Sequence, residues 1–252
     1  KGRPPEGQHL ARELDRIAAL HGPETIAAVI VEPVAGSTGV LIPPVGYLEE
    51  LRAACDRVGC LLIFDEVISG YGRMGQAFAT QALGVTPDLI ATAKGINNGA
   101  LPMGAVLAKR AVHDAFMSGP ENLIELFHGY TCSGHPAACA AGLATMDIMA
   151  REGLFTRVQE IEAYWQERLH QLETARHVID VRNLGLIGGI ELAPREGAIG
   201  ARGYEAFTAC FAAGALVRVT GDIIALSPPL TIEHAHIDRL IDTIGTALAG
   251  VD

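Results

Sequence analysis

The chain has 252 residues, 49% of them hydrophobic and 19% charged, which is the profile of a globular protein with a sizeable core. Its 19 basic and 29 acidic side chains give a formal charge of −10, and no basic run occurs. We therefore expect neither nucleic acid nor a membrane as a partner. The five cysteines form no CxxC pair and no cluster with zinc spacing, so we expect reduced thiols in a cytoplasmic protein and no metal site.

The first half of the chain alternates between amphipathic runs and short apolar runs. Leu10, Leu14 and Ile17 recur at helical spacing, whereas the continuous β-branched run before Pro33 predicts a buried strand. Such alternation is typical of parallel β-α-β units. The predicted elements are a helix at 9–21, a strand at 25–33, a helix at 47–59, a strand at 60–64, a short helix at 76–84, and strands at 88–93 and 103–109.

The second half has a different organisation. After a polar helical pattern at 111–122 comes a helix at 135–153 that is rich in small residues, which we expect to be buried because small residues allow close packing. The remaining pattern is that of an α+β unit with a mostly antiparallel sheet. We place the domain boundary in that helix, so that residues 1–147 form part of a large α/β domain and residues 148–252 a smaller C-terminal domain. The elements predicted for the smaller domain are helices at 154–173, 204–214 and 236–250, and strands at 178–185, 186–193, 215–219 and 222–228.

Two of the apolar strands run directly into an ionisable residue. The strand at 60–64 is followed by Asp65, and the strand at 88–93 is followed by Lys94. The carboxyl ends of parallel strands open into a common crevice, where a charge is costly unless it is paired or used. Lys94 is either a strand-end lysine whose head reaches water or a nucleophilic amine that forms a Schiff base with a carbonyl. Asp65 is either a helix cap or loop ion pair, or a carboxylate that holds a proton on a ring nitrogen.

Taken together, an amine and a carboxylate at neighbouring strand ends predict a pyridoxal 5'-phosphate site. Longer blocks of sequence strengthen this interpretation: IFDEVISGYGRMG, PDLIATAKGINNGALPMGAV and FHGYTCSGHPAACAAGLA. With these blocks the chain resembles the class III pyridoxal-phosphate aminotransferases of fold type I, and most of all the ω-amino acid:pyruvate aminotransferases. The resemblance extends over essentially the whole chain. It implies a large domain with a mostly parallel sheet and helices on both faces, together with a smaller α+β domain.

The resemblance also implies roles for particular residues. Lys94 would be the Schiff-base lysine, Asp65 would pair with the pyridinium nitrogen, and Val67 would pack on a face of the ring. Thr131 would donate its hydroxyl to the cofactor phosphate in the neighbouring subunit's site. From the residues alone, Val67 is equally a core valine and Thr131 a residue of a turn that precedes a helix. The implied assembly is a homodimer, or a dimer of dimers, with the active site at the subunit interface.

A substrate-binding role is implied for Arg218, which lies in an apolar strand pattern. An arginine there needs a partner, and this is either an acidic side chain of the same protein or a substrate carboxylate. Many similar enzymes that use 2-oxoglutarate carry a glutamate in the loop after the first strand, where this chain has Ser37 and Thr38. That difference favours pyruvate as the acceptor. Cys132 also stands where a tyrosine is usual in the family.

The implied function is the transfer of an amino group from an ω-amino acid or another amine to pyruvate, which gives alanine. The alternatives are an aminomutase, a racemase or a decarboxylase that uses the same cofactor, or a non-catalytic subunit with an incomplete site. Similar enzymes carry an upstream segment that holds the phosphate and stacks an aromatic ring on the cofactor. Neither feature is found before His9, so we expect that upstream sequence is missing.

Overall fold

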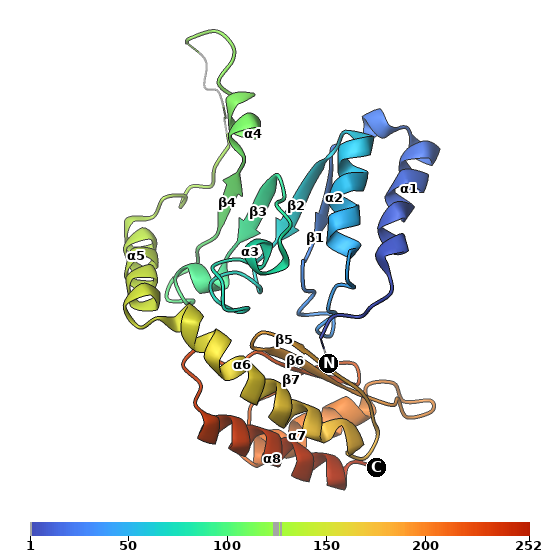
Figure 1. Cartoon of the computed structure of the whole chain (residues 1–252). Coiled ribbons are helices and arrows are strands. Elements are labelled where there is room, and N and C mark those ends of the chain that lie inside the picture. Colours follow the sequence, from blue (N-terminus) through green and yellow to red (C-terminus); the bar gives the residue numbers. More distant parts are fainter. Residues whose placement is uncertain (1, 123–125, 127) are drawn as a thin grey trace.

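The structure is a computed structural model that describes residues 2–122, 126 and 128–252. It has two units, each built on a four-stranded sheet (Figure 1). In the N-terminal unit the strand order is β1-β2-β3-β4, in which β1, β2 and β3 are parallel and β4 is antiparallel to β3. The strands are β1 (Ala28–Val31), β2 (Leu61–Asp65), β3 (Leu89–Thr92) and β4 (Ala105–Ala108).

One face of this sheet packs against helices. Val29 and Val31 of β1 and Leu62 and Phe64 of β2 form a core with residues of the first two helices, as alternation along a strand requires. On the opposite face, Ile30 is 62% exposed in the described part of the chain. The helical elements of this unit are η1 (Gln8–Arg12), α1 (Glu13–His21), η2 (Pro23–Thr25), α2 (Tyr47–Val58), α3 (Ala79–Leu83), η3 (Lys94–Ile96) and α4 (Arg110–Asp114).

Helix α5 (Pro136–Arg151) differs from its expected environment. Its small residues suggested a buried helix, but only Ala138 and Gly142 are buried, while Leu143 is 65% exposed. Composition indicates how closely a helix can be approached, and it does not indicate which segment approaches it. The predicted boundary between residues 147 and 148 falls inside α5 and stays a prediction.

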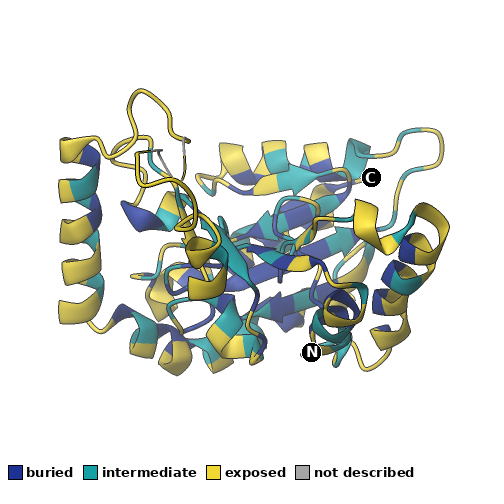
Figure 2. Ribbon diagram, turned by 90° about the horizontal axis from the view of Figure 1, so that it is seen from above, coloured by how far each residue is buried: buried dark blue, intermediate teal, exposed yellow. Residues whose placement is uncertain are grey.

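The C-terminal unit is an antiparallel sheet of order β5-β6-β8-β7 with three helices packed on one face (Figure 1). Trp165, Leu169, Ile190 and Ile224 are fully buried between these layers, and the buried residues in Figure 2 follow the strands and the inner helix faces. The mostly parallel first sheet and this smaller unit confirm the predicted α/β fold. The elements are α6 (Leu154–His170), η4 (Gln171–Thr174), β5 (Val178–Leu184), β6 (Ile187–Leu192), α7 (Ala201–Ala212), β7 (Arg218–Thr220), β8 (Ile223–Leu226) and α8 (His234–Gly250).

A third apolar cluster joins the two units. Val40 and Met74 of the N-terminal unit pack with Ile187 of β6, and the Arg182 side chain of β5 donates hydrogen bonds to the carbonyls of Gly39 and Val40. The contact therefore combines a buried apolar centre with charged hydrogen bonds. No helix in the described part of the chain is long and apolar enough to cross a membrane.

Candidate active site

A cavity of about 560 Å³ lies where the two units meet, and three of the five predicted site residues line it. Val67 and Lys94 come from the N-terminal unit, whereas Arg218 comes from the C-terminal unit. Tyr71 and Arg73, from the loop between β2 and α3, also line this cavity. The carboxyl ends of β2 and β3 point toward it, as expected for a ligand site at the edge of a parallel sheet.

Lys94 follows β3 as the first residue of the short helix η3. Its φ of +44° lies in the left-handed region, which is uncommon for a residue with a side chain and occurs mostly where surrounding structure holds it. Within the described residues the amine has no hydrogen-bond or ion-pair partner. We predicted partial desolvation, but Lys94 is exposed in the lining of the cavity. The amine is therefore free to react with a carbonyl group.

Asp65 is the last residue of β2 and lies opposite Ala91 of β3. Its Oδ1 accepts a hydrogen bond of 3.0 Å from the backbone N–H of Val67, which orients the segment leading from the strand into the cavity wall. Val67 lines the cavity, whereas Asp65, two residues earlier in the sequence, is not part of the lining. The roles of these two residues toward the cofactor stay predictions.

The neighbouring carboxylate, Glu66, was not recognised from the sequence. It is fully buried and accepts hydrogen bonds from the backbone N–H groups of Ala79 and Thr80 at the start of α3. The hydroxyls of Thr80 and Ser69 donate to it as well, at 2.9 Å and 3.2 Å. The helix-capping role considered for Asp65 thus belongs to Glu66. The two consecutive acids at the end of β2 were the available signal, since adjacent strand residues face opposite sides.

Tyr71 and Gly95 form a close contact in the cavity wall that sequence reasoning also missed. The Tyr71 hydroxyl is 2.9 Å from Oγ1 of Thr92, the last residue of β3. A Cβ atom placed on Gly95 would lie 2.7 Å from Tyr71 Cβ, closer than real side chains approach. Only glycine therefore allows the backbone after Lys94 to pass this ring.

Arg218 is the first residue of β7 and is exposed toward the cavity. We find no acidic partner for it among the described residues, so its guanidinium is available to a carboxylate. Ser37 and Arg218 line a smaller adjoining hollow, and the Ser37 carbonyl accepts a hydrogen bond of 2.9 Å from Thr220 Oγ1. The loop whose composition favoured pyruvate is thus adjacent to Arg218.

Thr131 is not brought to this cavity. It is exposed on the turn before α5 and does not line the cavity. Cys132, next to it, is exposed as well. Within one chain these residues lie outside the site, and a role for Thr131 in a partner's site stays a prediction.

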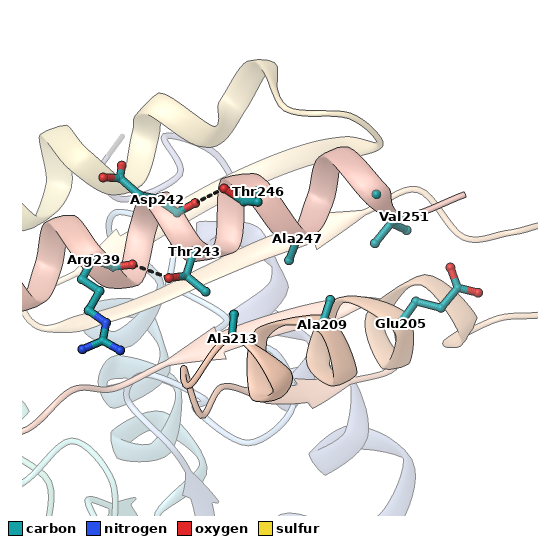
Figure 3. Close-up of a pocket in the computed structure, with 10 residues that line it drawn as sticks. Glu205, Ala209, Ala213, Arg239, Asp242, Thr243, Thr246, Ala247 and Val251 are labelled. Atoms are coloured by element: carbon teal, nitrogen blue, oxygen red, sulfur yellow. Dashed lines mark hydrogen bonds between the residues drawn. The ribbon is translucent and has the colours of Figure 1, made fainter.

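A second hollow lies on the outer side of the C-terminal unit, between α7 and α8. Figure 3 shows Ala209 of α7 and Ala213, the residue that follows α7, facing Ala247 of α8. The hydroxyls of Thr243 and Thr246 donate hydrogen bonds to carbonyls of their own helix. None of the predicted site residues lines this groove. The groove also has charged residues in its lining, of which Glu205 pairs with Arg195 and Asp242 with Arg168.

Comparison with known proteins identifies the family. A family model described as aminotransferase class-III matches residues 3–248. The chain belongs to the class-III aminotransferases. This confirms the resemblance that the strand-end residues and the three sequence blocks indicated.

Two curated relatives and one solved structure show which kinds of aminotransferase this class-III chain is similar to. It is 61% identical over 252 residues to an omega-aminotransferase of Caulobacter vibrioides, covering 100% of this chain and 57% of the relative. It is 48% identical over 247 residues to the beta-alanine–pyruvate aminotransferase of Pseudomonas aeruginosa, covering 97% and 55%. An (S)-enantioselective omega-transaminase from Thermomicrobium roseum superposes with a TM-score of 0.89 at 38% identity, covering 96% of this chain and 55% of that one. The chain spans a little more than half the length of the curated relatives.

Class-III aminotransferases use pyridoxal 5'-phosphate, and the cavity residues fit that group. Lys94 lines the cavity with an amine that has no partner in the described ranges, as a cofactor aldehyde requires. Val67 presents an apolar surface for a ring face, and the Asp65 carboxylate lies at the adjoining strand end. Arg218, which lines the same cavity from the C-terminal unit, adds a cation suited to a carboxylate.

Proposed function

We propose that the protein containing this chain transfers an amino group from an ω-amino acid or another amine to pyruvate in the cytoplasm, and so produces alanine. The observation that carries the proposal is that Lys94 of the N-terminal unit and Arg218 of the C-terminal unit line one cavity. The names of the two curated relatives, an omega-aminotransferase and a beta-alanine–pyruvate aminotransferase, support the same reaction class.

The positions of the residues support the following roles. When bound, pyridoxal 5'-phosphate supplies an electron sink for the charge left on the substrate carbon after a proton departs. The Lys94 amine would hold the cofactor through its aldehyde, and the same amine would serve as the general base that removes this proton and as the acid that returns it. Asp65 keeps the ring nitrogen protonated, because its carboxylate stabilises the positive charge of the pyridinium. Val67 orients the ring through apolar contact.

Arg218 selects the acceptor. Its guanidinium binds a carboxylate through two parallel hydrogen bonds, which suits both an amino acid and a keto acid. With Ser37 rather than an acidic residue beside it, Arg218 stays free in both half-reactions, and this favours the short keto acid pyruvate. Thr131 serves the phosphate of a partner's site in a homodimer or a dimer of dimers, which accounts for its distance from the cavity of its own chain.

Product analysis with pyruvate as the sole acceptor tests the reaction in the protein expressed from its complete coding sequence. A transaminase consumes one pyruvate for each alanine formed, whereas an aminomutase, a racemase or a decarboxylase leaves pyruvate untouched. Absence of alanine with β-alanine and a series of simple amines as donors would contradict the proposal.

A separate titration addresses the 252-residue chain by itself. We expect this chain to retain pyridoxal 5'-phosphate weakly and to turn over little, because the phosphate-binding loop seen in similar enzymes is not found in it. Tight binding with full turnover by this chain would show that its own residues complete the site.

A further inference from the structure

The Arg73 side chain spans the contact between the two units. Its Nη1 donates hydrogen bonds to the carbonyls of Leu186, at 3.1 Å, and of Pro228. The Leu186 N–H returns a hydrogen bond of 2.9 Å to the Arg73 carbonyl. Arg73 thus joins the loop after β2 to the turn between β5 and β6 and to the segment that follows β8.

This guanidinium has no carboxylate partner in the described part of the chain, and its bonds go to neutral carbonyls. Burial lowers the pKa of Arg73 to about 10, so the side chain is still charged at neutral pH. A partly buried cation without a counter-charge is costly, and carbonyl acceptors offset only part of that cost. An arginine retained under these conditions is expected to have a role besides stability.

The groups that Arg73 connects are those that shape the cavity. On one side, Arg73 belongs to the same loop as Val67, which follows the strand end at Asp65. On the other side, Pro228 follows β8, whose Ala225 is paired with Arg218 of β7. The orientation of Arg218 relative to Lys94 therefore depends on where the segment at Pro228 is held.

The contact around Arg73 is tightly packed. A Cβ atom on Gly185 would lie 2.4 Å from the Arg73 carbonyl oxygen, and one on Gly72 would lie 2.7 Å from Phe155 and Leu230 side-chain atoms. Gln159 also donates a hydrogen bond of 2.7 Å to the Gly75 carbonyl. Such close packing leaves little room for the two units to slide past each other. The hydrogen bonds of Arg73 across this contact therefore help to fix the position of the C-terminal unit at the cavity.

We propose that Arg73 is a positioning residue that holds the C-terminal unit so that Arg218 faces Lys94 across the cavity. The proposal rests on the proposed transamination, since the distance between these two walls matters when an amino or keto acid must reach both. Arg73 would act through Arg218 and would not bind the substrate carboxylate itself. Its loss should therefore weaken the use of carboxylate substrates and leave the chemistry at Lys94 in place.

The test is a double-mutant cycle in the protein expressed from its complete coding sequence. Arg73→Met, Arg218→Met and the double variant are compared for KM and kcat with pyruvate, and for the half-reaction with an amine that has no carboxylate. We expect Arg73→Met to raise the KM for pyruvate, by an amount on the order of 10²-fold at most, with little change in the amine half-reaction. The double variant should be no worse than Arg218→Met alone, because a residue that acts through another shows no additive loss.

Arg157→Met is the matched control. Arg157 also donates from its guanidinium to backbone carbonyls, those of Thr231 and Ile232, but it does not line the cavity. The Arg157→Met variant should have a lower midpoint of thermal unfolding than the wild type and an unchanged KM for pyruvate. Arg73→Lys, which keeps the charge and can reach one carbonyl, provides a milder variant if Arg73→Met does not fold, and its KM for pyruvate should lie between those of wild type and Arg73→Met.

Each result has a distinct meaning. Additive losses in the double variant, or a KM unchanged in both Arg73 variants of an active enzyme, would overturn the positioning role and leave the proposed transamination intact. A wild-type protein that incorporates the cofactor but transaminates with no donor would overturn the proposed function, and the positioning role with it.

Discussion

Lys94 and Arg218 line one cavity from two different sheets. Lys94 follows a central strand of the parallel sheet, and Arg218 begins an edge strand of the antiparallel sheet. Among the residues that the structure describes, neither the amine of Lys94 nor the guanidinium of Arg218 has an ion-pair partner. A substrate with a carboxylate at one end and an amine or carbonyl group at the other matches this arrangement, and the predictions below depend on it.

Replacing Lys94 by alanine should abolish covalent attachment of pyridoxal 5'-phosphate. Borohydride reduction followed by peptide mass spectrometry should find the cofactor on the peptide that contains Lys94 in the wild type and on no peptide in Lys94→Ala. Turnover should fall by about 10²–10⁴-fold or more, because the general base is lost together with the attachment point. Lys109→Ala is the control, since Lys109 pairs with Asp88 outside the cavity and its loss should leave the labelled peptide unchanged.

Amide substitution should lower turnover at Asp65 and should lower stability at the adjacent Glu66. Asp65→Asn should lower turnover with little change in the urea midpoint, because the amide oxygen can still accept the Val67 N–H but provides no negative charge for the ring nitrogen. Glu66→Gln should lower the free energy of unfolding by about 1–3 kcal/mol. The buried carboxylate accepts hydrogen bonds from the N–H groups of Ala79 and Thr80, and a neutral amide oxygen accepts them more weakly. Equal effects of both variants on turnover and on stability would contradict this division of roles.

An acid placed beside Arg218 should compete with the keto acid. In Ser37→Glu the new carboxylate enters the small hollow that Ser37 and Arg218 share, and it can pair with the guanidinium. An exposed ion pair between the new carboxylate and Arg218 would contribute about 1 kcal/mol. Since pyruvate must displace this pair, its KM should rise roughly fivefold. Thr38→Glu carries the same charge on an exposed position that does not line the hollow, and steady-state kinetics should find its KM unchanged.

Stability at acid pH should depend on Asp88. Burial alone would raise the pKa of this carboxyl, but hydrogen bonds from the Leu62 N–H and from Arg52 and Lys109 outweigh it and lower the pKa to about 2. Because the folded pKa lies below the unfolded one, this stabilisation is present above about pH 4 and is lost as the pH falls toward the folded value.

Thermal unfolding of the wild type and of an Asp88→Asn variant, measured from neutral pH down to about pH 2, tests this contribution. At neutral pH the variant should be less stable than the wild type by about 1.5–3 kcal/mol, the usual size of a hydrogen bond to a charged group. The gap should narrow as the pH approaches the folded pKa, where the wild-type carboxylate becomes protonated. A gap that stays constant down to that pH would show that the charge of Asp88 does not contribute.

The local pattern of the chain was sufficient to predict the strand that ends at Asp65, the strand that precedes Lys94, and the helices near them. Hydrophobic periodicity depends on neighbours a few residues apart, and so do end signals such as Gly59, which closes α2 in a left-handed conformation as expected. The resemblance of the blocks around these residues was sufficient for the family as well. These features are encoded within short segments, so the sequence by itself determined them.

The tertiary structure decided which distant segments meet. That Glu66 and not Asp65 caps α3, that Arg218 shares a cavity with Lys94, and that α5 presents Leu143 to the outside all depend on contacts between remote parts of the chain. The bridge from Arg73 to Leu186 and Pro228 belongs to the same class. Hydrophobic periodicity indicates which face of an element is buried, but packing in three dimensions determines what that face contacts. In this protein, tertiary packing determines which residues of the two units line the cavity together.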